Sequence, residues 1–151
     1  MELKKLNLAL DPSEDKKLLT AYTQINKLLQ ALGKKQLYEK VIASINSIID
    51  ELNSSSKTEN QLRNQIKHAQ KNILKILEKE QKYVPKNHYR NLWMAIGMSA
   101  FGIPIGAALG ASLDNMGLFS IGLPLGMVVG IAVGTGLDKK ALEQGNQLDF
   151  E

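Results

Sequence analysis

The chain has 151 residues, a net charge of +4, 44% hydrophobic residues and no cysteine. The length suits one or two small domains, and the lack of thiols excludes disulfide bridges and cysteine-based metal centres. This overall composition is the average of two dissimilar segments. Residues 1–90 carry 17 Lys or Arg against 10 Asp or Glu, whereas residues 91–151 carry 2 against 5. Only Gly33 of the 12 glycines precedes this border, so two segments of different physical class are joined there.

Three amphipathic helices are predicted in residues 1–84, because apolar residues recur there every three or four positions. The first begins at the capping sequence DPSE (11–14) and ends at Gly33, and the third begins at the Ser56–Glu59 pair and ends before Pro85. The apolar positions are, helix by helix, Leu18, Tyr22, Ile25, Leu29 and Leu32; Tyr38, Val41, Ile45, Ile48 and Leu52; Leu62, Ile66, Ala69, Ile73, Ile76 and Leu77. Short links favour a three-helix bundle; the alternative is long helices that pair only with other subunits.

Basic residues recur every three or four positions along the third helix and into the linker at residues 85–90. The row comprises Arg63, Lys67, Lys71, Lys75, Lys79, Lys82, Lys86 and Arg90. A solvated helix face is one explanation. The functional interpretation is attraction to an anionic lipid surface or an acidic partner, with the part of the row from Lys71 onward as the candidate site. Nucleic acid is not expected as a partner, since only Tyr83 and Tyr89 lie near the row and no base-reading motif is present.

Two uncharged stretches of 23 residues follow, at 91–113 and 115–137. As helices each would be about 34 Å long, enough to cross a hydrocarbon core of about 30 Å. A pair of buried helices in a soluble core is the alternative, but a domain of this size has too few other helices to cover them. We therefore predict a transmembrane helical hairpin at residues 91–137.

Positive charge flanks these spans on one side only. It lies at residues 71–90 before the first span and at 139–140 after the second, whereas the link DNMG (114–117) has none. The positive-inside rule then places both termini in the cytoplasm, with residues 138–151 as a cytoplasmic tail. The first residues lack the apolar stretch and cleavage site of a signal peptide.

The two spans repeat one motif, FGIPIG (101–106) and IGLPLG (121–126). If the chain reverses near Asp114, Pro104 and Pro124 both lie about 15 Å from the turn, near the bilayer midplane. Each proline removes the helical donor for the carbonyl four residues earlier. The two prolines are therefore candidate hinge residues, with tolerated kinks in a compact hairpin as the alternative.

Glycines recur at every fourth position of both spans, which permits close backbone approach in lipid. If the chain reverses near Asp114, Gly102 is expected at the level of Gly126, and Gly106 at that of Gly122. The candidate packing positions are Gly102, Gly106, Gly110, Gly122, Gly126, Gly130 and Gly134. The stretches GIPIGAALG and GLPLGMVVGIAVGTGLDKK resemble the two-helix glycine-zipper segments of many small bacterial membrane proteins. The likeness covers residues 91–140 and implies close helix packing and self-association.

The sequence has few residue patterns typical of a catalytic site. His68 and His88 are the only histidines and lie twenty residues apart, and the glycine series never reaches the Gly-Lys-Ser/Thr of a phosphate loop. We expect no cofactor and no metal, and an enzyme is the least favoured class.

The expected architecture is all-α: a cytoplasmic bundle at 1–84, a linker at 85–90, the transmembrane glycine-zipper hairpin at 91–137 and the tail at 138–151. In the favoured interpretation the chain is a homo-oligomer in the cell inner membrane that forms a pore or perturbs the bilayer, as a toxin-like or defence-type effector would. The periodic seam of the second helix and the glycine stripes both favour assembly. The alternative is a membrane tether whose bundle recruits a cytosolic protein.

Overall fold

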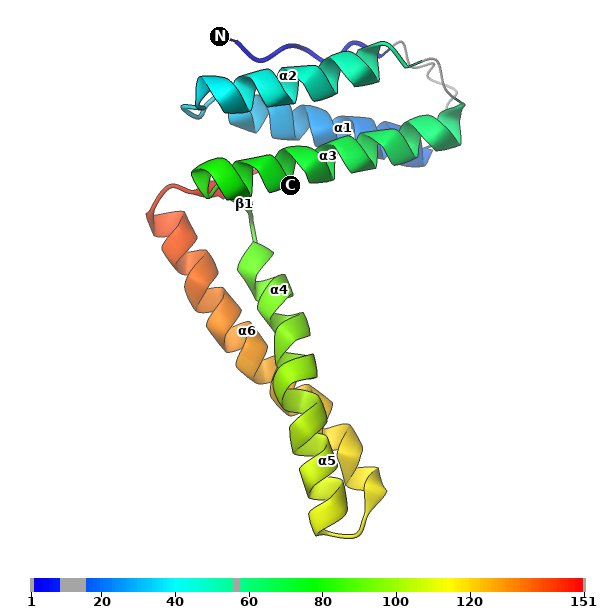
Figure 1. Cartoon of the computed structure of the whole chain (residues 1–151), viewed down its shortest axis with the longest axis vertical. Coiled ribbons are helices and arrows are strands. Elements are labelled where there is room, and N and C mark those ends of the chain that lie inside the picture. The colour runs from blue at the N-terminus through cyan, green and yellow to red at the C-terminus, as the bar shows by residue number, and fades with distance from the viewer. Residues whose placement is uncertain (1, 9–15, 56–57, 151) are drawn as a thin grey trace. The chain divides into compact units, whose positions relative to one another are not determined.

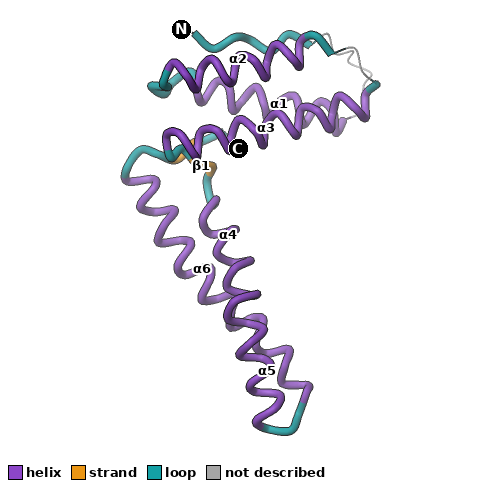
Figure 2. The backbone as a smooth tube through the Cα atoms, in the orientation of Figure 1, coloured by secondary structure: helices purple, strands orange, loops and turns teal. Residues whose placement is uncertain are grey.

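The structure, a computed structural model, describes residues 2–8, 16–55 and 58–150. Most of these residues are helical (Figures 1 and 2), which confirms the all-α class. Two short strands, β1 (Val84–Pro85) and β2 (Gln147–Leu148), pair with each other. The chain divides into two compact units, which are described separately: unit 1 is Met1–Pro85 with Leu148–Glu151, and unit 2 is Lys86–Gln147.

Unit 1 contains α1 (Lys16–Leu32), α2 (Glu39–Asn53) and α3 (Glu59–Gln81), and α3 contacts both of the others. Their apolar positions meet in one core, as the helical periodicity predicts. The buried core side chains on these helices are Leu18, Ala21, Ile25, Leu28, Leu32, Val41, Ile45, Ile49, Leu52, Leu62, Ile66, Ala69, Ile73 and Leu77.

The helices of unit 1 end close to where the sequence predicts. Gly33 follows α1 and donates its backbone N–H to Leu29 at 3.0 Å. At the end of α3, Lys82 adopts a left-handed conformation with φ 59°, so the helix stops before Pro85. The predicted capping residues at 11–14 and Ser56 lie outside the described residues.

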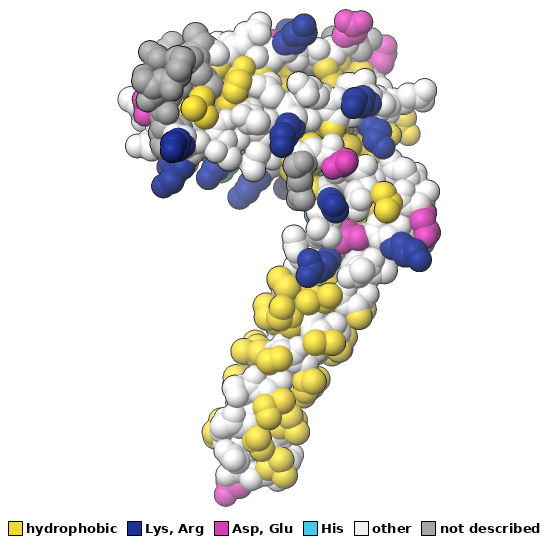
Figure 3. Space-filling view, turned by 180° about the vertical axis from the view of Figure 1, so that it is seen from behind, with side chains coloured by type: hydrophobic (Ala, Val, Ile, Leu, Met, Phe, Trp, Pro, Cys, Tyr) yellow, Lys and Arg dark blue, Asp and Glu magenta, His cyan; other side chains and the backbone are white. Residues whose placement is uncertain are grey.

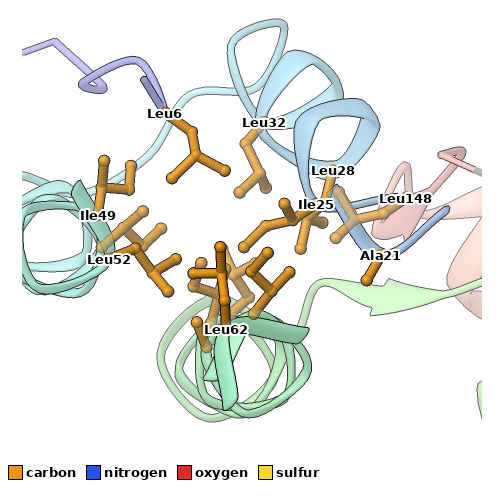
Figure 4. Close-up of a cluster of buried hydrophobic side chains, with 14 of the residues drawn as sticks. Leu6, Ala21, Ile25, Leu28, Leu32, Ile49, Leu52, Leu62 and Leu148 are labelled. Carbon is orange, nitrogen blue, oxygen red and sulfur yellow. The ribbon is translucent and has the colours of Figure 1, made fainter. Parts of the chain in front are cut away.

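The predicted seam of α2 needs a correction. Tyr38 is exposed and precedes the helix. Of the neighbours Ile48 and Ile49, the second is fully buried and the first only partly. The cause is an additional segment: residues 2–8 lie along α2 and insert Leu6 into the core, facing Ile49 and Leu52 on α2 and Leu28 and Leu32 on α1 (Figure 4). Because this segment covers a second side of α2, the buried face of the helix is broader than one seam.

Residues 138–151, predicted as a tail, are divided in the structure. Helix α6 (Phe119–Glu143) continues through the first of them. It ends because Gly145 adopts φ 70°. The N–H groups of Gly145 and Asn146 donate to the carbonyls of Leu142 and Ala141, which is the hydrogen-bond pattern of a helix that ends at a glycine. Leu148 then enters the core of unit 1, where it is fully buried.

We expect Leu148→Ala to lower the free energy of unfolding of unit 1 by about 2–5 kcal/mol, because the substitution leaves a cavity in a close-packed core. Urea titration of the detergent-solubilised chain measures the change. The control is Leu142→Ala, at an exposed leucine six residues earlier, which should change the midpoint little. Equal effects of the two substitutions would contradict a packing role for Leu148.

Candidate functional site: an apolar helical hairpin

Unit 2 is a hairpin of two helical arms. The first arm consists of α4 (His88–Gly97), a π-helical turn (Met98–Gly102) and α5 (Ile103–Ser112). The second consists of a 3₁₀ turn (Met116–Leu118) and α6. The arms are 25 and 28 residues long, and both are long and apolar enough to cross a membrane.

The chain reverses between the arms where the sequence predicts it. Asp114 has φ 46°, a left-handed conformation that short polar side chains tolerate. The side-chain carbonyl of Asn115 then accepts a hydrogen bond from the N–H of Gly117 at 3.0 Å and starts the second arm.

The outer surface of the hairpin carries its large apolar side chains. Only 17% of the most apolar window of each arm is buried, whereas the chain itself covers most of a helix in a soluble core. Hydrophobic side chains are accordingly spread along the hairpin in Figure 3. The exposed ones in the arms and their turn include Leu92, Ile96, Phe101, Ile103, Leu113, Met116, Ile121, Leu123, Leu125, Met127, Val128, Val129 and Val133. This surface is suited to apolar surroundings.

Glycine forms the inner surface, where the arms meet. All seven candidate packing glycines are buried, as is Gly97. A Cβ atom on Gly126 would lie 2.5 Å from the backbone nitrogen of Gly102, and one on Gly130 would lie 2.7 Å from the carbonyl carbon of Trp93. Real Cβ atoms do not approach so closely, so the two backbones are in direct contact.

The glycines of the two arms interleave. Gly122 lies between Gly102 and Gly106, and Gly126 lies between Gly97 and Gly102. The two expected pairs, Gly102 with Gly126 and Gly106 with Gly122, are therefore close together. Gly122 and Gly126 each also meet a second glycine of the first arm, Gly102 and Gly97 respectively, which the reversal at Asp114 alone does not predict.

The π-helical turn brings Gly97 into this interface. Gly97 and Gly102 are five residues apart, and in a regular α-helix a five-residue step rotates the face by about 140°. Here the N–H of Ile103 donates a hydrogen bond to the carbonyl of Met98, five residues earlier, which widens the turn. Gly97 therefore shares a face with Gly102, and counting every fourth position missed it.

The two prolines occupy different structures despite their matching sequence positions. Pro104 lies in the first turn of α5, directly after the π-helical turn. Pro124 lies inside α6, which continues from Phe119 to Glu143. A widened turn thus precedes one proline and not the other. Their role as hinges stays a prediction.

Asp138 joins the two arms at the end opposite the turn. Its carboxylate is 7% exposed and accepts hydrogen bonds from the backbone N–H groups of Tyr89 at 3.0 Å and Arg90 at 2.9 Å. These donors belong to the first turn of α4, which has no partners for them within its own helix. The negative charge also suits the positive end of the helix dipole. Sequence reasoning missed this contact, although Asp138 continues the four-residue spacing of Gly126, Gly130 and Gly134.

The structure divides the predicted basic row. Lys67, Lys71, Lys75 and Lys79 are exposed along α3. Because Lys82 ends that helix in a left-handed conformation, helical spacing does not carry the row on to Lys86 and Arg90, which belong to unit 2. The two parts are therefore separate clusters of positive charge.

Other titratable groups form no centre within the described part of the chain. No group of three or more His, Asp or Glu there is arranged to hold a metal ion. His68 is exposed beside a small hollow of about 80 Å³, and the ring of His88 packs edge-on against Tyr89 with centroids 5.1 Å apart.

Substitution of one glycine tests the interface. We expect Gly126→Ala to separate the arms, because its Cβ would lie 2.7 Å from the Cα of Gly102. Gly136→Ala is the matched control on the same helix, since a Cβ there meets nothing within 4 Å and alanine raises helix stability by about 1 kcal/mol. Distances between spin labels on the two arms should lengthen only for Gly126→Ala. Identical distances in both variants would contradict backbone contact at Gly126.

Removal of the Asp138 carboxylate tests the link at the open end. We expect Asp138→Ala to destabilise the start of α4 by about 1–2 kcal/mol, because two backbone donors lose their acceptor. Hydrogen exchange at Tyr89 and Arg90 should accelerate, and Asp138→Asn, which keeps one acceptor oxygen, should show a smaller effect. Glu143→Ala, at an exposed carboxylate near the end of the same helix, is the control. Unchanged exchange in Asp138→Ala would contradict the capping role.

Comparison with protein-family models, curated proteins and solved structures gave no match.

Proposed function

We propose that the hairpin spans a membrane and tethers unit 1, a three-helix bundle, to the cytoplasmic surface, where the bundle binds a protein partner. The observation that carries the membrane assignment is the inverted burial of unit 2, with glycine inside and large aliphatic side chains outside. Lipid tails favour such an arrangement, and helical arms satisfy their own backbone groups in lipid. In this proposal the glycine zipper holds together the two helices of one chain.

Chain connectivity supports the topology. The hairpin is inserted between Pro85 and Leu148, both of which belong to unit 1. This connectivity favours a topology in which both ends of the hairpin lie on the same side of the bilayer. Positive charge before and after the spans favours the cytoplasmic side, and the turn at Asp114 reaches the opposite side. In a bacterium this is a multi-pass protein of the inner membrane with both termini in the cytoplasm.

The polar groups of the spans favour a tether over an aqueous pore. The hydroxyl of Ser99 donates to the carbonyls of Ala95 and Ile96 in its own helix, and that of Ser120 donates to Gly117. The packing glycines likewise lie against the other arm of the same chain. A water-filled pore needs polar groups that line it. A non-enzymatic anchoring role without a cofactor is consistent with this arrangement.

Basic residues add a second membrane contact in this proposal. Lys71, Lys75 and Lys79 on α3 and, independently, Lys86 and Arg90 at the start of the hairpin are exposed. Each such charge near an anionic leaflet contributes about 1 kcal/mol of attraction.

A homo-oligomeric pore or bilayer-perturbing effector is the second candidate. The widened turn before Pro104 favours it, because π-helical turns and prolines are the usual places where helices bend and often mark functional sites. The exposed aliphatic surface of the arms would then pack against further copies.

Labelling of single cysteines tests the topology, since the chain has none of its own. In inside-out vesicles, whose outer face is the cytoplasmic one, a membrane-impermeant maleimide should modify Gln144→Cys and not Asn115→Cys. In spheroplasts the pattern should reverse. Modification of both positions from one side only would contradict a spanning hairpin.

Dye release from liposomes separates the two candidates. The tether predicts that the wild-type chain releases no dye at any protein density, and that Pro104→Ala with Pro124→Ala changes nothing. Release by the wild type would favour the pore, and loss of that release in the double variant would assign the hinge to the prolines.

A further inference from the structure

Three polar side chains lie on one face of α2, at Asn46, Asp50 and Asn53. Their spacing of four and three residues places them in a row along the helix. Residues 2–8 lie against this row, and Figure 1 shows this blue segment beside α2.

Each asparagine binds the backbone of the segment through both ends of its amide. The Asn46 carbonyl accepts from the N–H of Lys4 at 2.8 Å, while its amino group donates to the carbonyl of Glu2 at 2.9 Å. Asn53 repeats the pattern three residues further along the segment. Its carbonyl accepts from the N–H of Asn7 at 2.8 Å, and its amino group donates to the carbonyl of Lys5 at 3.2 Å. An amide side chain here replaces the N–H and C=O that a neighbouring β-strand would offer.

The spacing of the two asparagines along α2 matches the spacing of the backbone groups that they bind. Seven helical residues from Asn46 to Asn53 advance about 10.5 Å, and three residues of extended chain advance about 9–10 Å. The row can therefore bind successive backbone groups of an extended peptide without bending it. Such main-chain bonds provide affinity for a peptide, and side-chain pockets provide the selectivity.

Two side chains of the segment supply that selectivity. Leu6 is 5% exposed in the core, and the ammonium of Lys4 pairs with Asp50 at 2.6 Å. The rest is held loosely: Leu3 and Leu8 are only partly buried, and hollows of about 350 and 460 Å³ border the segment. One buried leucine, four amide bonds, a bond of 3.4 Å from the Tyr22 hydroxyl to the Leu6 carbonyl and an exposed ion pair hold the segment on the helices.

We propose that the Asn46–Asp50–Asn53 row is a binding site for an extended peptide, and that residues 2–8 of a second copy occupy it when two copies meet. The second copy is the occupant because its segment offers the same leucine, lysine and backbone groups at the same spacing. Exchange of an identical element joins copies without creating any new contact. The inference concerns unit 1 and does not depend on how the hairpin crosses the bilayer.

Crosslinking of differently tagged chains tests the exchange. One full-length chain carries Lys4→Cys and the other Asp50→Cys; the two are coexpressed, purified in detergent and treated with a short bismaleimide. We expect a heterodimer carrying both tags. Asn46→Ala with Asn53→Ala in both chains should lower its yield by up to about tenfold, because the segment is then held less firmly on whichever α2 it occupies; this is the equivalent of one or two net hydrogen bonds. Asn72→Ala, at an exposed asparagine on α3, should not lower the yield.

The controls make each outcome decisive. A chain with both Lys4→Cys and Asp50→Cys reports the segment bound to its own α2, as a crosslinked monomer. A pair of Lys4→Cys with Lys67→Cys, exposed on α3, reports random collisions. Heterodimer no more abundant than this collision control would overturn the exchange and leave the segment bound within its own chain. Failure of the doubly substituted chain to crosslink either internally or between copies would overturn the site itself.

Discussion

Direct contact between two helical backbones is the constraint on which the hairpin depends. Where Gly122 and Gly126 meet the first arm, no side chain fits between the arms. Every larger residue must therefore point outward, and the apolar exterior is a consequence of the interface as much as of the surroundings. The π-helical turn follows from the same constraint, since it keeps Gly97 in line. Close approach also lets Asp138 reach the first turn of the opposite arm.

The two units stabilise helices by opposite means. Unit 1 buries leucine and isoleucine in a shared core and exposes its charges, so burial of apolar surface from water drives its packing. Unit 2 buries glycine and exposes aliphatic side chains, so van der Waals contact between backbones holds its arms together. One chain thus contains a unit suited to water and a unit suited to lipid. A tether needs both.

Side-chain amides attach the irregular parts of unit 1 to its helices. Asn46 and Asn53 bind residues 2–8, and Gln81 at the end of α3 binds the α1–α2 link in the same manner, donating to the carbonyl of Gln36 at 2.9 Å and accepting from the N–H of Tyr38 at 3.2 Å. Each amide joins a carbonyl and the N–H two residues later. One device thus attaches two irregular segments to the helices of unit 1.

The sequence by itself determined the helices, the reversal at Asp114 and the glycine faces, because periodicity, turn chemistry and the absence of charge are local properties. It also indicated the core of α3 correctly at Leu62, Ile66, Ala69, Ile73 and Leu77. Only the tertiary structure decided the partners of Asp138, the return of Leu148 to the core and the attachment of residues 2–8. The hydrogen bonds of Asp138, Asn46 and Asn53 join residues more than 40 positions apart. Nothing in the local pattern specifies which distant group an isolated carboxylate or amide will meet. The shift from Ile48 to Ile49 in α2 has the same origin, since a neighbouring segment, and not the periodicity of the helix, selects the buried side.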